Sequence, residues 1–215
     1  MSKNVSIKRP VNRVKRPFSG MTRLPLVVIT SSVFAVAGLS QDLDPATWQN
    51  KLTYHALNAY GPPALAESAA YDGFLQEINY PREWGQGAAG YGRRVGSTLA
   101  YSGIRNVLGL CLDAALHQDP RYYRSGQGSL WGRTTHAIRG TFLTRKDSGG
   151  ETLATWRFAS AYGATFLSNE WYPDRLNTMK VGLEQGSTQI AFDLLSNLRS
   201  EFWPDVKNKI LRRKP

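Results

Sequence analysis

Apolar residues recur three and four positions apart along most of this chain, which is the spacing of one buried face of an α-helix. The longest such run covers residues 93–117, where the apolar positions are Val95, Leu99, Val107, Leu110 and Ala114. The same spacing predicts four shorter helices, over residues 45–59, 64–78, 130–144 and 153–168. Strict alternation is rare, so we expect a mainly α protein, a compact single-domain bundle of about five to six helices.

Turn-forming residues mark the ends of several of these helices. Asp44-Pro45 is an N-cap followed by proline at the first helical position, and Gly61-Pro62-Pro63 stops that helix. Asp119-Pro120 ends the long helix over residues 93–117. A long final helix is predicted from the Asn177-Thr178 cap onward, and Pro204 kinks or ends it.

Small residues recur four apart on these helices, in the sets Gly92, Gly96 and Ala100, then Ala159 and Gly163, then Gly182 and Gly186. Glycine inside a helix costs about 1 kcal/mol relative to alanine, so its repeated use suggests that helices approach closely there. We expect Gly96 and Gly163 at helix–helix contacts. The same motif packs helices in membranes, but charges such as Arg105 and Asp113 favour a soluble or peripherally attached bundle.

The N-terminal segment has the three parts of a secretory signal peptide. Seven basic residues and no acid precede an apolar run at 24–39 that ends in small residues. We therefore expect residues 1–40 to direct export from a bacterial cytoplasm to the periplasm or cell envelope, with Met21 as an alternative start. An uncleaved membrane anchor remains the other interpretation. A helical domain over 41–206 and a basic tail over 207–215 would follow.

Most of the net positive charge of the chain lies in this N-terminal segment. Seven of the eleven net positive charges belong to it, so the basic composition gives no support to nucleic-acid binding. The remaining basicity gathers in the tail, at Lys207, Lys209, Arg212, Arg213 and Lys214. Such a tail is usually solvated, but it also suits anionic lipid headgroups. The single cysteine, Cys111, excludes an internal disulfide, and its apolar neighbours predict a buried hydrophobic side chain.

No motif in the chain discloses a reaction. Residues 85–90 match G-x-G-x-x-G, but no strand precedes them, and we expect only a glycine-rich turn into the next helix. The three histidines, His55, His117 and His136, lie far apart without the spacing of metal ligands. We therefore expect neither a metal nor a cofactor.

One polar segment stands out, residues 117–125, where the long helix ends. Arg121 and Arg124 would suit a phosphate or carboxylate, with His117 as general acid or base and Asp119 orienting it. Pro120 turns the chain, which would bring an arginine towards Glu83 or Asp174. The structural interpretation of the same residues is a polar corner in which His117 and Asp119 cap backbone groups. The arginines would then pair with Glu83, Asp174 or Asp205. We favour this structural interpretation.

Tryptophans recur beside acids and turns, in Glu83-Trp84-Gly85-Gln86-Gly87, Trp171-Tyr172-Pro173-Asp174 and Glu201-Phe202-Trp203-Pro204-Asp205. Together with Gly90-Tyr91-Gly92-Arg93-Arg94 and His117-Gln118-Asp119-Pro120-Arg121-Tyr122, this set resembles a family of exported bacterial proteins of unknown function. The resemblance covers residues 54–209. It implies export and a single domain, and it assigns no catalytic residue.

Two hypotheses follow for function. The first is a non-enzymatic envelope protein, a helical module whose partner is a membrane surface or another envelope protein. The second is an envelope hydrolase or transferase that acts on a phosphorylated or glycan substrate at residues 117–125. A fully paired corner would favour the first, and an open pocket with converging charges would favour the second.

Overall fold

The computed structural model describes residues 47–212, with side chains to residue 210. In chain order the elements are α1 (Trp48–Tyr60), α2 (Pro62–Glu77), the 3₁₀ turn η1 (Arg82–Trp84), α3 (Gly87–Ala115), α4 (Leu130–Phe142), β1 (Leu143–Arg145), β2 (Glu151–Leu153), α5 (Thr155–Asn169) and α6 (Met179–Arg212). The mainly α prediction is confirmed. The expected signal peptide and the Asp44-Pro45 cap lie outside the described residues.

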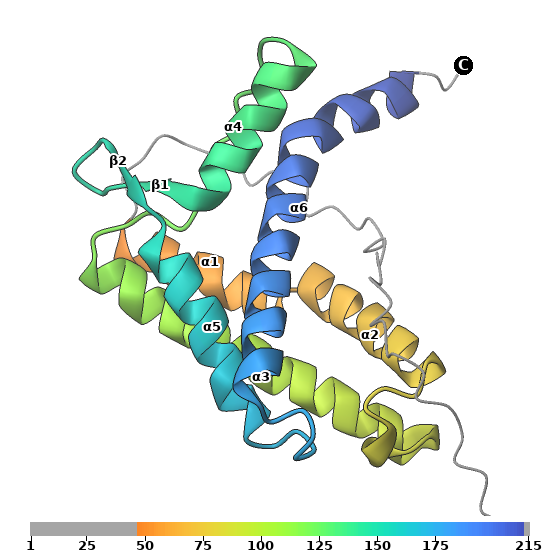
Figure 1. Ribbon diagram of the computed structural model, residues 1–215. Helices are drawn as coiled ribbons and strands as arrows, with labels where there is room; N and C mark the ends of the chain where they lie inside the picture. The colour runs from red at the N-terminus through yellow and green to blue at the C-terminus, as the bar shows by residue number, and fades with distance from the viewer. Residues whose placement is uncertain (1–46, 213–215) are drawn as a thin grey trace, which may run out of the picture. The chain divides into compact units, whose positions relative to one another are not determined.

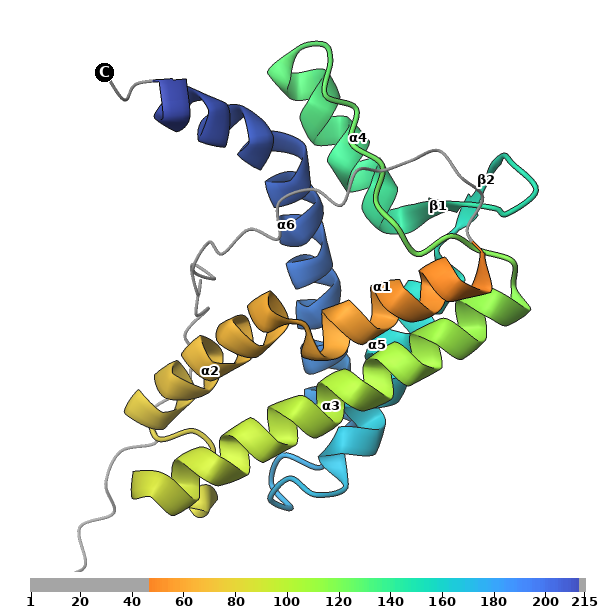
Figure 2. The ribbon, with the colours of Figure 1, turned by 180° about the vertical axis from the view of Figure 1, so that it is seen from behind.

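The long helix α3 carries α1, α2 and α5, which pack directly on it. Helices α1 and α2 follow one another along one side of it, and α5 packs along another side (Figure 2). Helix α6 contacts both α5 and α4, so that α4 and the C-terminal part of α6 lie at one end of the bundle (Figure 1). Figure 1 shows α6 changing direction towards its C-terminal end, and Pro204 lies inside this helix, which continues to Arg212. The prediction of a kink at this proline is therefore confirmed.

The element ends differ from the predicted ones for local reasons. Thr47 caps α1, its hydroxyl accepting from the amide of Asn50 at 3.3 Å. Pro62 both follows the end of α1 and occupies the first turn of α2, where its missing N–H is no loss. Helix α3 begins at Gly87, six residues before the predicted start. The prediction missed these residues because the glycines and alanines of the first turns show no apolar periodicity. As expected, a turn with positive φ at Gly85 and Gly87 leads into it.

A two-stranded hairpin, β1 and β2, was not predicted. Its strands pair antiparallel, with Leu143 opposite Leu153 and Arg145 opposite Glu151. Strands of three residues are too short to produce a readable alternation, so the helical spacing of the flanking segments hides them. The hairpin matters for the site because Lys146, next to β1, forms an isolated bridge with Gln118.

The small-residue contacts form between α5 and α6 and between α3 and α5. A Cβ on Gly182 would clash with the Phe166 ring, and one on Gly186 would clash with the Tyr162 ring. A Cβ on Gly163 would lie 3.3 Å from Leu108 of α3. The prediction for Gly96 is wrong, because a Cβ there would meet nothing within 4 Å. This glycine faces outward, beside a groove rather than a helix.

These glycines give a paired prediction. Gly186→Leu should destabilise the protein by about 1–3 kcal/mol, because the added side chain forces α5 and α6 apart. Gly96→Leu should leave stability unchanged or raise it by up to about 1 kcal/mol, because helix propensity improves and nothing is displaced. Urea denaturation of both variants beside the parent measures the difference. Equal losses in the two variants would contradict it.

Charged and polar side chains occupy much of the interior. Arg94, Asp72, Asp113 and Glu201 are fully buried, whereas the buried apolar residues include several alanines. Cys111, expected to be buried, is exposed on α3. No helix within residues 47–212 is both long and apolar enough to cross a membrane.

Candidate functional site

The polar corner, residues 117–125, leaves α3 through a left-handed turn. His117 has φ 51°, and the amide of Gln118 donates to the carbonyl of Asp113 at 2.8 Å, which closes the helix end. The amide of Asp119 then donates to the carbonyl of Arg145 at 2.8 Å. The hairpin therefore fixes the backbone that carries the predicted site residues.

Asp119 lies at the centre of the first half of the corner. Its carboxylate accepts from Arg121 Nη2 at 2.8 Å, from Arg121 Nε at 3.0 Å and from the Tyr123 hydroxyl at 2.5 Å. Burial raises the pKa of Asp119, but the bonds from Arg121 and Tyr123 outweigh burial and bring this pKa below its usual value. Burial and the same hydrogen bond raise the pKa of the Tyr123 hydroxyl to about 12. Asp119 is thus an ionised acceptor held by its own neighbours.

Glu201 of α6 organises the second half of the corner. Its Oε1 accepts from Arg133 Nε at 2.8 Å and from the Gly126 amide at 2.9 Å. Its Oε2 accepts from the Tyr122 hydroxyl at 2.8 Å and from the Ser125 amide at 2.9 Å. Burial raises the pKa of Glu201, but these donors outweigh burial and hold the pKa at about 2. Four protein donors, two at each oxygen, thus bind this carboxylate.

The proline kink of α6 adds a second set of bonds beside Glu201. The backbone carbonyl of Glu201 accepts from Arg124 Nε at 2.9 Å and also from Arg133 Nη2. Asp205, one residue past Pro204, pairs with Arg124 and with Arg133, each at 2.7 Å. The structural interpretation named Asp205 as a partner of the arginines, and for Arg124 this is confirmed.

His117 does not act with Asp119. Its side chain is 80% exposed, and its nearest acid is Asp147, with Nδ1 3.9 Å from Oδ2. Within the described residues no hydrogen bond joins the imidazole to Asp119. The His117 side chain thus lies in solvent, whereas Asp119 is buried.

The expected approach of the corner to Glu83 and Asp174 is wrong. Glu83 lies in η1, before α3, whereas the corner follows the other end of this 29-residue helix. At about 1.5 Å per residue, the two ends of α3 are about 43 Å apart. Glu83 pairs instead with Arg175, through Nε–Oε1 at 2.5 Å and Nη2–Oε2 at 3.0 Å. Asp174 is an exposed neighbour of Arg175.

Sequence reasoning missed a buried polar chain under the corner. His55 Nε2 lies 2.7 Å from Asp113 Oδ2, and Lys51 Nζ bonds to Asp147 Oδ2 at 2.8 Å and to the Asp113 carbonyl at 3.2 Å. Burial raises the pKa of Asp113 against the opposing effect of His55. The available signal was the polar residues Lys51 and His55, four apart on one face of α1. No group of three or more metal-ligating side chains occurs within residues 47–212.

The chemistry of the corner is therefore that of a closed network, in which carboxylates and guanidinium groups bind one another and the backbone. Comparison with family models, with curated proteins and with solved structures gives no match. The resemblance carried by the tryptophan motifs and by residues 117–122 stays a prediction.

Proposed function

We propose that this protein is exported to the cell envelope and works there as a non-enzymatic helical module on a membrane surface. The proposal rests on the exposed apolar side chains at one end of the bundle, which α4 and the last turns of α6 form. Two large apolar side chains open α4 there, Leu130 at 73% and Trp131 at 74% exposure. Tryptophan is enriched at the boundary between lipid and water, where its ring suits both.

The neighbouring part of α6 supplies the charge that such a surface needs. Val206 and Ile210, one helical turn apart, are exposed together with Lys207 and Lys209. Basic residues beside anionic headgroups contribute about 1 kcal/mol each. The sequence continues with three more basic residues at 212–214. Apolar anchors next to basic side chains match an anionic bilayer surface.

The closed corner supports the non-enzymatic part of the proposal. The carboxylates of Asp119 and Glu201 already bind protein donors, so neither is poised to act on a substrate. The alternative hypothesis, a hydrolase or transferase at residues 117–125, needs charges that converge on an open pocket. Arg124 forms an ion pair with Asp205, and this pairing gives the enzyme hypothesis less support.

Vesicle co-sedimentation tests the membrane proposal on protein recovered from the envelope fraction. We expect binding to vesicles that contain phosphatidylglycerol, weak binding to phosphatidylcholine alone, and a fall in binding with added salt. The double variant Leu130→Ser/Trp131→Ser should bind at least tenfold more weakly, because a tenfold change corresponds to about 1.4 kcal/mol and burying one such side chain contributes about 1.5–3 kcal/mol.

The matched control is Val107→Ser/Met179→Ser, which removes two exposed apolar side chains from other parts of the bundle. This control should bind as the parent does. Equal binding by all three proteins, or recovery of the chain only from the cytoplasm, would contradict the proposal.

A further inference from the structure

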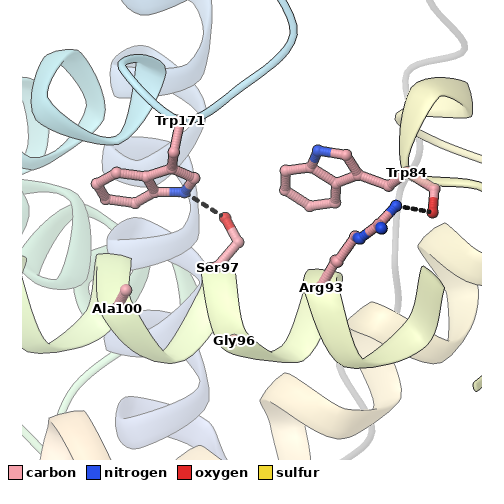
Figure 3. Close-up of a pocket in the computed structure, with 6 residues that line it drawn as sticks. All are labelled: Trp84, Arg93, Gly96, Ser97, Ala100 and Trp171. Atoms are coloured by element: carbon pink, nitrogen blue, oxygen red, sulfur yellow. Dashed lines mark hydrogen bonds between the residues drawn. The ribbon is translucent and has the colours of Figure 1, made fainter. Parts of the chain in front are cut away.

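A groove lies on α3 between two tryptophans, at the end of the bundle opposite the polar corner. It has a volume of about 350 Å³, and its lining is Trp84, Arg93, Gly96, Ser97, Ala100 and Trp171. Figure 3 shows the two indoles above the helix, with Gly96 between them. The small residues that the sequence suggested as a helix contact thus form the floor of an open groove.

Both indoles are held in place by the protein. Trp171 Nε1 donates to the buried Ser97 hydroxyl at 2.8 Å, and the Trp84 ring packs on Tyr172 with centroids 4.8 Å apart. The Glu83–Arg175 ion pair joins η1, which carries Trp84, to the loop that carries Trp171. A site whose walls are fixed before binding loses less entropy when a ligand enters.

The lining also defines what the groove would accept. Two aromatic rings above a glycine–alanine floor suit a flat ring with an apolar face. Arg93 is the one charged side chain of the lining, it is exposed, and its Nη1 donates to the Trp84 carbonyl at 3.1 Å. A guanidinium at the rim favours an acidic group on the ligand.

We propose that this groove binds a small ring compound that carries an acidic group, with the ring between Trp84 and Trp171 and the acid at Arg93. A volume near the lower limit of ligand sites suits one or two rings. Aromatic acids and sugar acids share this chemistry. The site is separate from the membrane surface proposed above, so either proposal stands if the other fails.

Titration calorimetry with three probes tests the proposal on the full protein. The probes are 2-naphthalenesulfonate, its neutral counterpart 2-naphthol, and glucuronate. We expect saturable binding of an acidic probe, and 2-naphthalenesulfonate should bind at least fivefold more tightly than 2-naphthol. Arg93→Gln should abolish this preference for the acid. Binding of glucuronate at similar strength shows that the groove accepts sugar acids as well as aromatic acids, and binding of the sulfonate alone restricts the ligands to aromatic acids.

Gly96→Leu places a branched side chain in the groove, and its Cβ meets nothing within 4 Å. It should weaken binding of the acidic probe at least tenfold. Gly73→Leu is the matched control, since this exposed helical glycine of α2 is equally open, and it should bind as the parent does. The proposal is overturned if no acidic probe binds saturably, if Gly96→Leu binds like the parent, or if 2-naphthol binds as tightly as the sulfonate.

Discussion

Glu201→Gln is expected to destabilise this protein by about 3–5 kcal/mol, the usual loss when one partner of a buried ion pair is removed. Both oxygens of Glu201 accept from donors, namely Arg133, Tyr122 and the amides of Ser125 and Gly126. An amide side chain must therefore turn its own NH₂ towards a donor in either orientation. The substitution keeps the shape of the side chain and removes only its negative charge and one of its two acceptor oxygens.

Urea denaturation at pH 7 measures this loss, with Glu184→Gln as the control. Glu184 lies on the same helix, is exposed, and forms a surface ion pair with Lys180 at 3.8 Å, so its loss should change stability by less than about 0.5 kcal/mol. The pKa of Glu201 is lowered to about 2, so its contribution is present above its ordinary pKa of 4.5. The contribution is lost as pH falls from 4.5 towards 2. A Glu201→Gln protein as stable as the parent at pH 7 would show that the corner does not hold α6 in place.

Asp72 is expected to give the opposite pH dependence of stability to Glu201. It is fully buried, its Oδ1 accepts from the Thr98 hydroxyl at 2.7 Å, and no described partner reaches Oδ2. Burial raises its pKa from 3.8 to about 6, against the effects of Thr98 and Arg94. The folded state then binds this proton more tightly than the unfolded state. The stability from Asp72 is therefore full below pH 3.8 and lost as pH rises through about 6.

Between pH 4 and pH 7 this single group should cost the parent about 2 kcal/mol of stability. Asp72→Asn cannot titrate, so its stability relative to the parent should rise by that amount over the same range. Glu77→Gln is the control, because Glu77 is an exposed acid on the same helix. Denaturation curves at several pH values give the comparison. A constant difference between Asp72→Asn and the parent across this range would contradict the raised pKa.

The helices could be predicted because each has a face that packs against a neighbour. Their spacing depends only on local geometry, so α1 to α6 were all anticipated, although several ends moved by a few residues. The hairpin was missed because three-residue strands carry no periodicity. Gly96 was misassigned because a small-residue stripe has the same appearance whether a helix or solvent lies above it. Only the packing of α5 on α6 distinguishes Gly186 from Gly96.

The corner was recognised as polar, but most of its partners lie far away in sequence. The pair of Asp119 and Arg121 is local and follows from the turn at Pro120. Glu201 meets Ser125 and Tyr122 across 76 and 79 residues, and no spacing rule links these positions. The expected contact with Glu83 was wrong because the length of α3 separates the two ends. Long-range pairing depends on how helices cross, which a single sequence does not encode in any local pattern.

The arginine contacts around Pro204 have a mechanical consequence. A proline inside a helix removes one backbone hydrogen bond and makes a joint that can flex. Here Arg133 grips Glu201 before the joint and Asp205 after it. The Arg133 guanidinium therefore links the parts of α6 before and after Pro204, which restricts bending of the helix at this proline. Because Arg133 belongs to α4, a force applied to the C-terminal end of α6 is transmitted to α4, the helix that carries Leu130 and Trp131.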